Sequence, residues 1–189
     1  KRKPPSAGLA AAGIVLNNKK RNLVMRKYSA ILGNLGNTCD RFCGSYKDNP
    51  STLEMLQRAG KIEGITGIEL VGTWDIRPDN AHDMRKALED MNLECVSIIP
   101  DLFADKLWRS GSLSSRDAAV RAHAMDYLRR MSDIALEMGC GIINLWPGQD
   151  GYDYLFQSNY LAERGWLVEN IATLAQEYPA LRFALEYKA

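Results

Sequence analysis

The sequence predicts an α/β protein, and three observations lead to that fold class. First, five short apolar segments that are typical of strands alternate along residues 28–188 with four longer segments of helical periodicity. Second, the strand-like segments are nearly continuous apolar runs bounded by Gly or Pro, as buried parallel strands are. Third, the connections that follow strands are long and polar, whereas those that follow helices are short. We therefore expect one parallel sheet covered by helices, with its polar loops at one edge.

The predicted elements follow one another in a regular order. They are strand 28–36, helix 50–62, strand 65–72, helix 80–92, strand 93–100, helix 114–139, strand 141–146, helix 160–178 and strand 181–188. Each strand is an apolar run that ends at Gly, Pro or a polar loop. Each helix repeats apolar residues every three or four positions, as Met84, Leu88 and Met91 do.

The helix ends have their own signals. We expect Ser51 or Thr52 to cap the first helix and Ser114 or Ser115 to cap the third. Hydroxyl side chains at these positions accept hydrogen bonds from the N–H groups that a helix leaves unpaired at its start. Gly139 is expected to end the third helix, because glycine readily takes the left-handed conformation found after helix C-termini.

Two architectures fit the alternation, an open doubly wound sheet and an eight-stranded barrel. The turn after the first strand, GNLGNT, lacks the third glycine of the dinucleotide-binding motif and does not lead straight into a helix. The loops after the strands mix carboxylates, aromatics and glycine, as the functional loops of a barrel do. Because a barrel needs eight strands and ~250 residues, we expect a (β/α)8 TIM barrel truncated after about five strands.

Charge divides the chain into two parts. Residues 1–27 hold eight Lys or Arg and no acidic residue, which leaves 16 basic against 23 acidic residues in the remainder. We interpret residues 1–24 as a basic, disordered N-terminal extension, with a secretion signal as the less favoured alternative, and residues 25–189 as the partial barrel domain. The acidic body excludes nucleic acid as an expected partner. The apolar run at residues 7–16 is too short to span a bilayer as a helix, so no membrane association is expected.

The cysteines and the sheet edges bear on location and assembly. Cys39, Cys43, Cys95 and Cys140 lack the spacing of a metal knuckle, and we expect free thiols in a cytoplasmic protein. A Cys39–Cys43 disulfide remains an alternative. Five strands leave an open edge on each side of the sheet, which makes a homo-oligomer possible.

Aromatic and polar residues at two strand ends are candidates for binding a sugar. Trp146 ends a strand, and an indole there can stack its apolar face on C–H groups; the alternative is a core tryptophan under a loop. Gln149 and Asp150 follow at once and are suited to hydrogen-bond sugar hydroxyls. Phe103, in the loop after strand 93–100, is either a second aromatic contact or an anchor for that loop.

Strand 65–72 contributes further candidates. Side chains alternate faces along a strand, so if Leu70 packs against the helices, Glu69 points into the barrel interior. A carboxylate buried there is either functional or paired with an interior Lys or Arg. Trp74 and Asp75 follow where the strand reaches the rim.

The last strand carries a carboxylate and an ammonium on one face. Glu186 can serve as a hard oxygen ligand for Mg²⁺ or Mn²⁺. Lys188, two residues on, can polarise a carbonyl oxygen beside that metal. His82 and His123 lie within predicted helices and are expected to be solvated, which argues against a histidine-rich zinc site.

Residues 64–189 resemble the N-terminal two-thirds of a xylose isomerase-like TIM barrel, a superfamily of metal-dependent sugar isomerases and sugar-phosphate isomerases and epimerases. The stretches that carry the resemblance are DLFADKLWRSGSLSSRD, NLWPGQDGYDY and LRFALEYK. The resemblance implies that Glu186 is the first metal-ligand carboxylate and that Lys188 contacts the substrate carbonyl oxygen. It also implies that Trp146 and Phe103 lie along the sugar.

The sequence departs from this family at one catalytic position. Val71 stands where xylose isomerases carry the histidine that opens the sugar ring. Either another residue such as Asp75 opens the ring, or the substrate is already open-chain. The remaining metal ligands would come from strands six to eight.

Together these interpretations predict a cytoplasmic, divalent-metal-dependent aldose–ketose isomerase. It would act on a small-molecule sugar with Mg²⁺ or Mn²⁺ as cofactor and move hydrogen between C1 and C2. A sugar or sugar-phosphate epimerase is the first alternative; it would use paired carboxylates as acid and base. An inactive, truncated barrel fragment is the second.

Overall fold

The sheet has the strand order of a barrel wall. The computed structural model describes residues 27–36, 46–147, 152 and 154–186. Within them, five parallel strands pair in the order β1-β2-β3-β4-β5. They are β1 (Tyr28–Ile31), β2 (Ile65–Val71), β3 (Glu94–Ile99), β4 (Ile142–Leu145) and β5 (Arg182–Leu185). A doubly wound sheet would reverse its order at a switch point, whereas this sheet keeps the sequential order of a TIM barrel. The predicted α/β fold, a five-stranded part of such a barrel, is confirmed.

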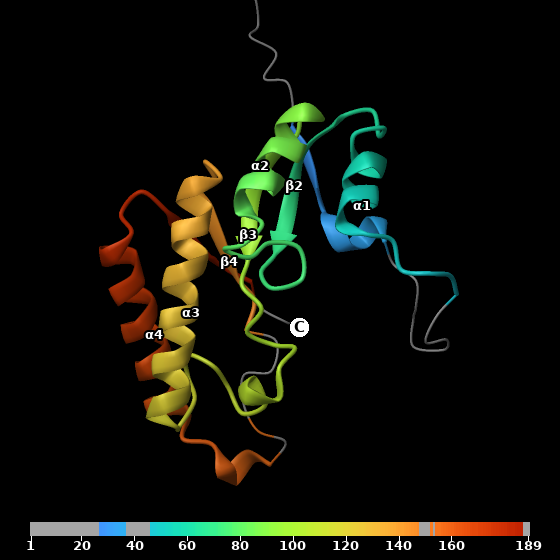
Figure 1. Cartoon of the computed structure of the whole chain (residues 1–189). Helices are drawn as coiled ribbons and strands as arrows, with labels where there is room; N and C mark the ends of the chain where they lie inside the picture. Colours follow the sequence, from blue (N-terminus) through green and yellow to red (C-terminus); the bar gives the residue numbers. More distant parts are fainter. Residues whose placement is uncertain (1–26, 37–45, 148–151, 153, 187–189) are drawn as a thin grey trace, which may run out of the picture.

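Helices connect successive strands. The α-helices are α1 (Thr52–Ala59), α2 (Ala81–Asp90), α3 (Ala118–Glu137) and α4 (Tyr160–Glu177). Short 3₁₀ helices lie in the connections at η1 (Leu32–Leu35), η2 (Lys106–Trp108) and η3 (Leu155–Gln157). In Figure 1 the helices from α1 to α4 follow one another along the sheet in chain order. None of the helices in the described part is both long and apolar enough to span a membrane.

The core lies between the sheet and the helices. Ile68 and Leu70 of β2 are fully buried, as are Ile98 of β3 and Ile143 of β4. Leu128 of α3 lies in the same hydrophobic cluster. Each such side chain contributes about 1.5–3 kcal/mol by leaving water. Because Ile68 and Leu70 share this face of β2, the residue between them must face the other side of the sheet.

Two helix ends follow the sequence signals. Ser51 caps α1: its Oγ accepts a hydrogen bond from Glu54 N (3.3 Å), and Glu54 Oε2 accepts one from Ser51 N (2.7 Å). This reciprocal pair satisfies two N–H groups at the helix start. Gly139 follows α3 with a φ of 68°, the left-handed conformation expected of a residue that ends a helix.

The predicted start of α3 is wrong. The helix begins at Ala118, and its cap is Asp117, whose carboxylate accepts a hydrogen bond from Ala119 N at 2.8 Å. Ser115 is buried in the turn that precedes the helix, where its Oγ accepts a hydrogen bond from Asp117 N. The hydroxyl therefore stabilises the turn, and the carboxylate two residues on caps the helix.

The first strand is also shorter than predicted. β1 pairs with β2 only as far as Ile31, and Leu32–Leu35 then form η1.

The predicted extension at residues 1–24, together with Cys39 and Cys43, lies outside the described residues. Cys95 and Cys140 are free thiols. His82 and His123 are exposed on α2 and α3, as predicted.

Candidate functional site

The face of the sheet opposite the helices forms a groove lined by polar and apolar side chains. Its volume is about 480 Å³, and all five strands, or the residue that follows one, contribute to its lining. The lining residues are Ser29, Glu69, Val96, Ser97, Ile142, Asn144, Ala184, Leu185 and Glu186. Since this face of a barrel wall points to the barrel interior, we call this feature the inner groove.

Glu69 lies in the inner groove between two serine hydroxyls. Its carboxylate accepts a hydrogen bond from Ser97 Oγ at 2.8 Å and a longer one from Ser29 Oγ at 3.4 Å. The predicted orientation of Glu69, opposite to Leu70, is thus what the structure shows. The alternative of an ion pair with an interior Lys or Arg is not seen among the described salt bridges.

A register shift brings Ser97 to Glu69. β2 and β3 pair with Ile68 opposite Cys95, but the next pair is Glu69 with Ser97, so β3 holds one extra residue at this point. The extra residue, Val96, also lines the inner groove. Such a bulge re-aims the side chains that follow it, and here it places a hydroxyl beside the carboxylate.

Glu186 lies at the other side of the inner groove, directly after β5. Asn144 Nδ2 donates a hydrogen bond to Glu186 Oε2 at 2.8 Å, and Glu186 N donates to Leu145 O at 3.0 Å. Glu186 Oε1 has no hydrogen-bond partner among the described residues, so it can accept from a ligand or bind a cation. Lys188 lies outside the described residues.

Three aromatic side chains meet at the carboxyl ends of the strands. The ring centroids of Trp74 and Phe103 are 5.7 Å apart, and those of Phe103 and Trp146 are 4.6 Å apart. The interplanar angles of 77° and 69° are those of edge-to-face contacts, which aromatic rings prefer. The residues follow β2, β3 and β4 respectively, and Trp74 is 56% exposed. We call this cluster the aromatic wall; it offers apolar ring surface to a ligand at the rim.

Asp75 is buried beneath the rim and turned back toward its own strand. Its carboxylate accepts a hydrogen bond from Val71 N at 2.9 Å, and its backbone oxygen accepts one from Asn80 Nδ2 at 3.0 Å. Burial raises the pKa of the Asp75 carboxyl, and the hydrogen bond from Val71 opposes this only in part. The carboxylate of Asp75 accepts from Val71 N and does not line the inner groove, so the catalytic role of Asp75 remains a prediction.

Four polar residues near these groups were not identified from the sequence. Ser29, Ser97 and Asn144 line the inner groove, and Asp101 contacts Trp74. Ser29, Ser97 and Asn144 each interrupt an apolar run, and such an interruption could have identified them as candidates. Choosing them required knowing which strand positions lie beside Glu69 and Glu186, and a sequence does not give that register.

The donor chemistry of the inner groove fits a hard divalent cation. Glu69 and Glu186 supply carboxylate oxygens, which Mg²⁺ and Mn²⁺ prefer. Among the residues that the structure describes, no group of three or more His, Cys, Asp or Glu side chains gathers closely enough to hold a metal ion. Glu186 is therefore at most a part of such a site. Gln149 and Asp150, the remaining candidates, lie outside the described residues.

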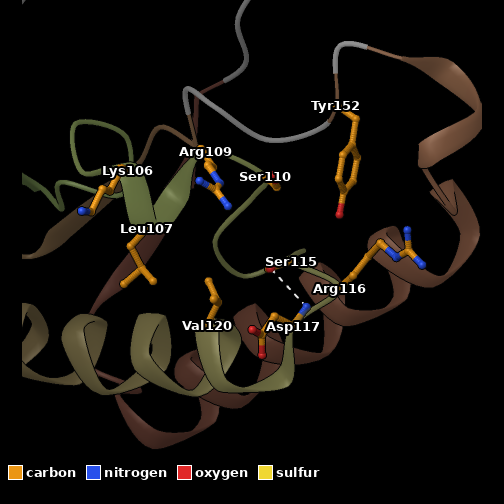
Figure 2. Close-up of a pocket in the computed structure, with 9 residues that line it drawn as sticks. All are labelled: Lys106, Leu107, Arg109, Ser110, Ser115, Arg116, Asp117, Val120 and Tyr152. Atoms are coloured by element: carbon orange, nitrogen blue, oxygen red, sulfur yellow. Dashed lines mark hydrogen bonds between the residues drawn. The ribbon is translucent and has the colours of Figure 1, made fainter.

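A second pocket, of about 680 Å³, lies between the loops after β3 and β4 and the start of α3. Figure 2 shows Arg109 and Ser110 on one side of it and Tyr152 on the other. Arg116 donates a hydrogen bond to Gln157 O at 3.1 Å, and so links the two loops. Among the described residues that line this pocket, the only carboxylate is that of the helix cap Asp117. We therefore place the candidate site in the inner groove and the aromatic wall.

The sequence is similar to that of known sugar isomerases. The family model described as xylose isomerase-like TIM barrel matches residues 56–188. The xylose isomerase of Thermus thermophilus is 30% identical over 109 residues, which cover 55% of this chain and 28% of that protein. The chain thus spans less than a third of the length of this curated relative.

Solved structures of related barrels have the same fold. D-Psicose 3-epimerase from Clostridium cellulolyticum H10, solved with D-tagatose, matches with a TM-score of 0.57 at 14% identity, over 72% of this chain and 47% of that one. AP endonuclease, family 2, from Brucella melitensis matches with a TM-score of 0.56 at 16% identity, over 85% and 54% of the two chains. At these identities the likeness concerns the fold alone.

Proposed function

This chain belongs to the xylose isomerase-like TIM barrel family, and we propose that it binds a small sugar between the inner groove and the aromatic wall. We further propose that the sugar is converted by a divalent-metal-dependent aldose–ketose isomerisation, with hydrogen moving between C1 and C2. The observation that supports this best is the pair of carboxylates, Glu69 and Glu186, in one groove on the inner face of a barrel wall. Active sites of TIM barrels lie at the carboxyl ends of the strands, where Glu186 and the aromatic wall are found.

Each part of the site has a role in this proposal. The aromatic wall packs against the C–H face of the sugar and excludes water from it. Glu69 accepts hydrogen bonds from sugar hydroxyls, and the two serines that donate to it keep its carboxylate in place. The proton transfer needed for ring opening is assigned to Asp75, whose carboxylate would have to turn from Val71 N toward the sugar.

Glu186 would hold the cation, and Asn144 fixes the orientation of its carboxylate. Mg²⁺ or Mn²⁺, when bound there, supplies polarisation of the substrate oxygens. Lys188, expected from the sequence to share a face with Glu186, would steady the charge that develops on the carbonyl oxygen. Further ligands for the cation would be needed beyond the residues described.

An epimerase is the second candidate, and one observation favours it. Two carboxylates share the inner groove, and an epimerase needs an acid and a base on opposite sides of one carbon. The two reactions differ in the path of the hydrogen. A substrate deuterated at C2 keeps its deuterium in a hydride shift and loses it to water in proton transfer, so mass spectrometry of the product distinguishes them.

The first test is calorimetric titration of Mn²⁺ into the 189-residue chain, beside the Glu186→Gln variant. We expect one bound ion and at least a tenfold loss of affinity in the variant, because a neutral amide is a poor ligand for a hard cation. Ser110→Ala, in the second pocket, is the matched control and should bind like the parent chain. Equal binding by parent and E186Q would contradict the metal site at Glu186.

Turnover is measured separately with a panel of aldoses and ketoses in the presence of Mn²⁺. Conversion that is lost in E186Q and retained in the control supports the isomerase. Absence of any conversion supports the remaining alternative, an inactive barrel fragment. The proposal also includes a cytoplasmic location and self-association of the chain.

A further inference from the structure

We infer that Asp101 is a positioning residue that holds the aromatic wall in the arrangement a sugar requires. This inference rests on the proposed function, in which the aromatic wall receives the sugar. Asp101 is a buried carboxylate in the loop directly after β3, and the proposed reaction gives it no chemical role.

The Asp101 carboxylate joins the loops that carry two members of the aromatic wall. Its Oδ2 accepts hydrogen bonds from Trp74 Nε1 at 2.9 Å and from Thr73 Oγ1 at 3.0 Å, both in the loop after β2. Its Oδ1 accepts from Ala104 N at 2.9 Å and from Phe103 N at 3.4 Å, in its own loop. One side chain therefore sets the indole of Trp74 and the backbone of Phe103 at the same time.

All four partners of this carboxylate are donors. An ionised carboxylate has only acceptor sites, so it can satisfy all of them together. Hydrogen bonds to a charged acceptor are about twice as strong as those between neutral groups. An amide in its place would present an N–H₂ group to one pair of these donors, and that contact would be lost.

The backbone beside Trp74 is strained, and Asp101 holds it. Thr73 has a φ of 66°, a left-handed conformation that is unfavourable for a β-branched residue. A strained residue persists only where several surrounding contacts hold it in place, and such residues are concentrated at functional sites. The hydrogen bond from Thr73 Oγ1 to Asp101 is one such constraint, and it orients the residue next to Trp74.

The backbone of Asp101 is in turn anchored to a core helix. Asp101 N donates a hydrogen bond to the Tyr127 hydroxyl at 3.0 Å, and Tyr127 is buried in α3. A Cβ added at Gly72 would lie only 2.5 Å from that hydroxyl, so the end of β2 packs directly against it. The loops of the aromatic wall are thereby fixed to the helix layer rather than to each other alone.

The test compares sugar binding by the parent chain, Asp101→Asn, Trp74→Phe and the double variant. Tryptophan fluorescence is titrated with D-xylose, D-fructose, D-tagatose and D-allulose. We expect D101N and W74F each to weaken binding about tenfold, and the double variant to be little weaker than either, because both disturb the contact between Trp74 and the loop after β3. Additive losses would overturn the inference.

A matched control separates positioning from simple destabilisation. Leu128→Ala removes a fully buried side chain of α3 from the hydrophobic core, and should lower the melting temperature at least as much as D101N. Its affinity for sugar should stay within twofold of the parent. An equal loss of affinity in L128A would show that Asp101 acts only through stability and would overturn the inference.

A measurement without sugar distinguishes this inference from the proposed function. The four tryptophans give four indole N–H signals in a nitrogen-15 NMR spectrum, and W74F identifies the signal of Trp74. We expect that signal to exchange slowly with solvent in the parent chain and at least tenfold faster in D101N. An unchanged exchange rate overturns the role of Asp101, whereas a parent chain that binds none of the sugars overturns the proposed function.

Discussion

Glu69 and Leu70 are adjacent in the sequence, yet their side chains lie on opposite faces of β2. Leu70 is fully buried under the helices, whereas Glu69 accepts hydrogen bonds from two serines in the inner groove. At the residue scale, the site therefore depends on strand alternation, which is a local property. Asp75 shows the limit of this reasoning, because its place after the strand did not reveal that its carboxylate turns back to Val71.

The buried carboxyl of Asp75 leads to a prediction about pH. Because burial raises its pKa, the folded chain binds this proton more tightly than the unfolded chain does. The stability contributed by the proton is fully present below the unfolded pKa of about 3.9 and is lost as pH rises through the folded pKa. Asp75→Asn cannot titrate and should lack this loss.

The measurement is the melting temperature of the parent chain and of D75N between about pH 4 and pH 7. We expect the parent to lose stability relative to D75N as pH rises across this window. Asp79→Asn, at an exposed position in the same loop, is the control and should leave the pH dependence of the parent unchanged. A difference in melting temperature between parent and D75N that stays constant with pH would contradict a raised pKa of the buried Asp75 carboxyl.

At the scale of the elements, the helix caps agree with the sequence-based expectation at α1 but not at α3. The Ser51–Glu54 pair caps α1 as its spacing indicates. At α3 the cap expected from the sequence is Ser114 or Ser115, although Asp117, a residue of similar capping propensity, follows two residues after Ser115. In the structure Ser114 and Ser115 are buried in the preceding turn, and Asp117 caps the helix.

Removal of the α1 cap should have a moderate cost. We expect Ser51→Ala to lower the free energy of unfolding by about 1 kcal/mol, since it leaves Glu54 N without its side-chain acceptor. Ser51→Gly should cost only a few tenths of a kcal/mol, because glycine is itself tolerated at this position. Urea unfolding followed by circular dichroism measures both, and equal losses in the two variants would count against the cap.

At the scale of the whole molecule, the sheet is an open wall. β1 and β5 each pair with a single strand in the described part of the chain. Leu185 at the end of β5 is 64% exposed and also lines the inner groove. Unpaired strand edges with apolar side chains promote association with other strands.

This arrangement predicts that the chain associates through the β5 edge. We expect the average mass in sedimentation velocity to rise with protein concentration, and Leu185→Lys to reduce that rise because charge on an edge strand opposes pairing. Leu161→Lys, on a leucine of α4 that is even more exposed than Leu185, should leave association unchanged. A monomer at every concentration, or equal effects of the two variants, would contradict the prediction.

The sequence by itself determined the alternation of strands and helices, the face on which Glu69 lies, and the placing of Trp74, Phe103 and Trp146 after three neighbouring strands. These features depend on periodicity and chain order. Because parallel strands run in the same direction, the loops that follow them lie at one edge of the sheet. Hence three residues chosen from separate loops proved to be in contact.

Only the tertiary structure decided which partners these residues have. The register shift in β3 places Ser97 beside Glu69, and the pairing of β4 with β5 brings Asn144 to Glu186. Asp101 accepts a hydrogen bond from Trp74, which lies in another loop and 27 residues earlier in the chain. Such contacts depend on the packing of distant segments, in which a shift of one residue turns a side chain to the other face, and no local pattern specifies them.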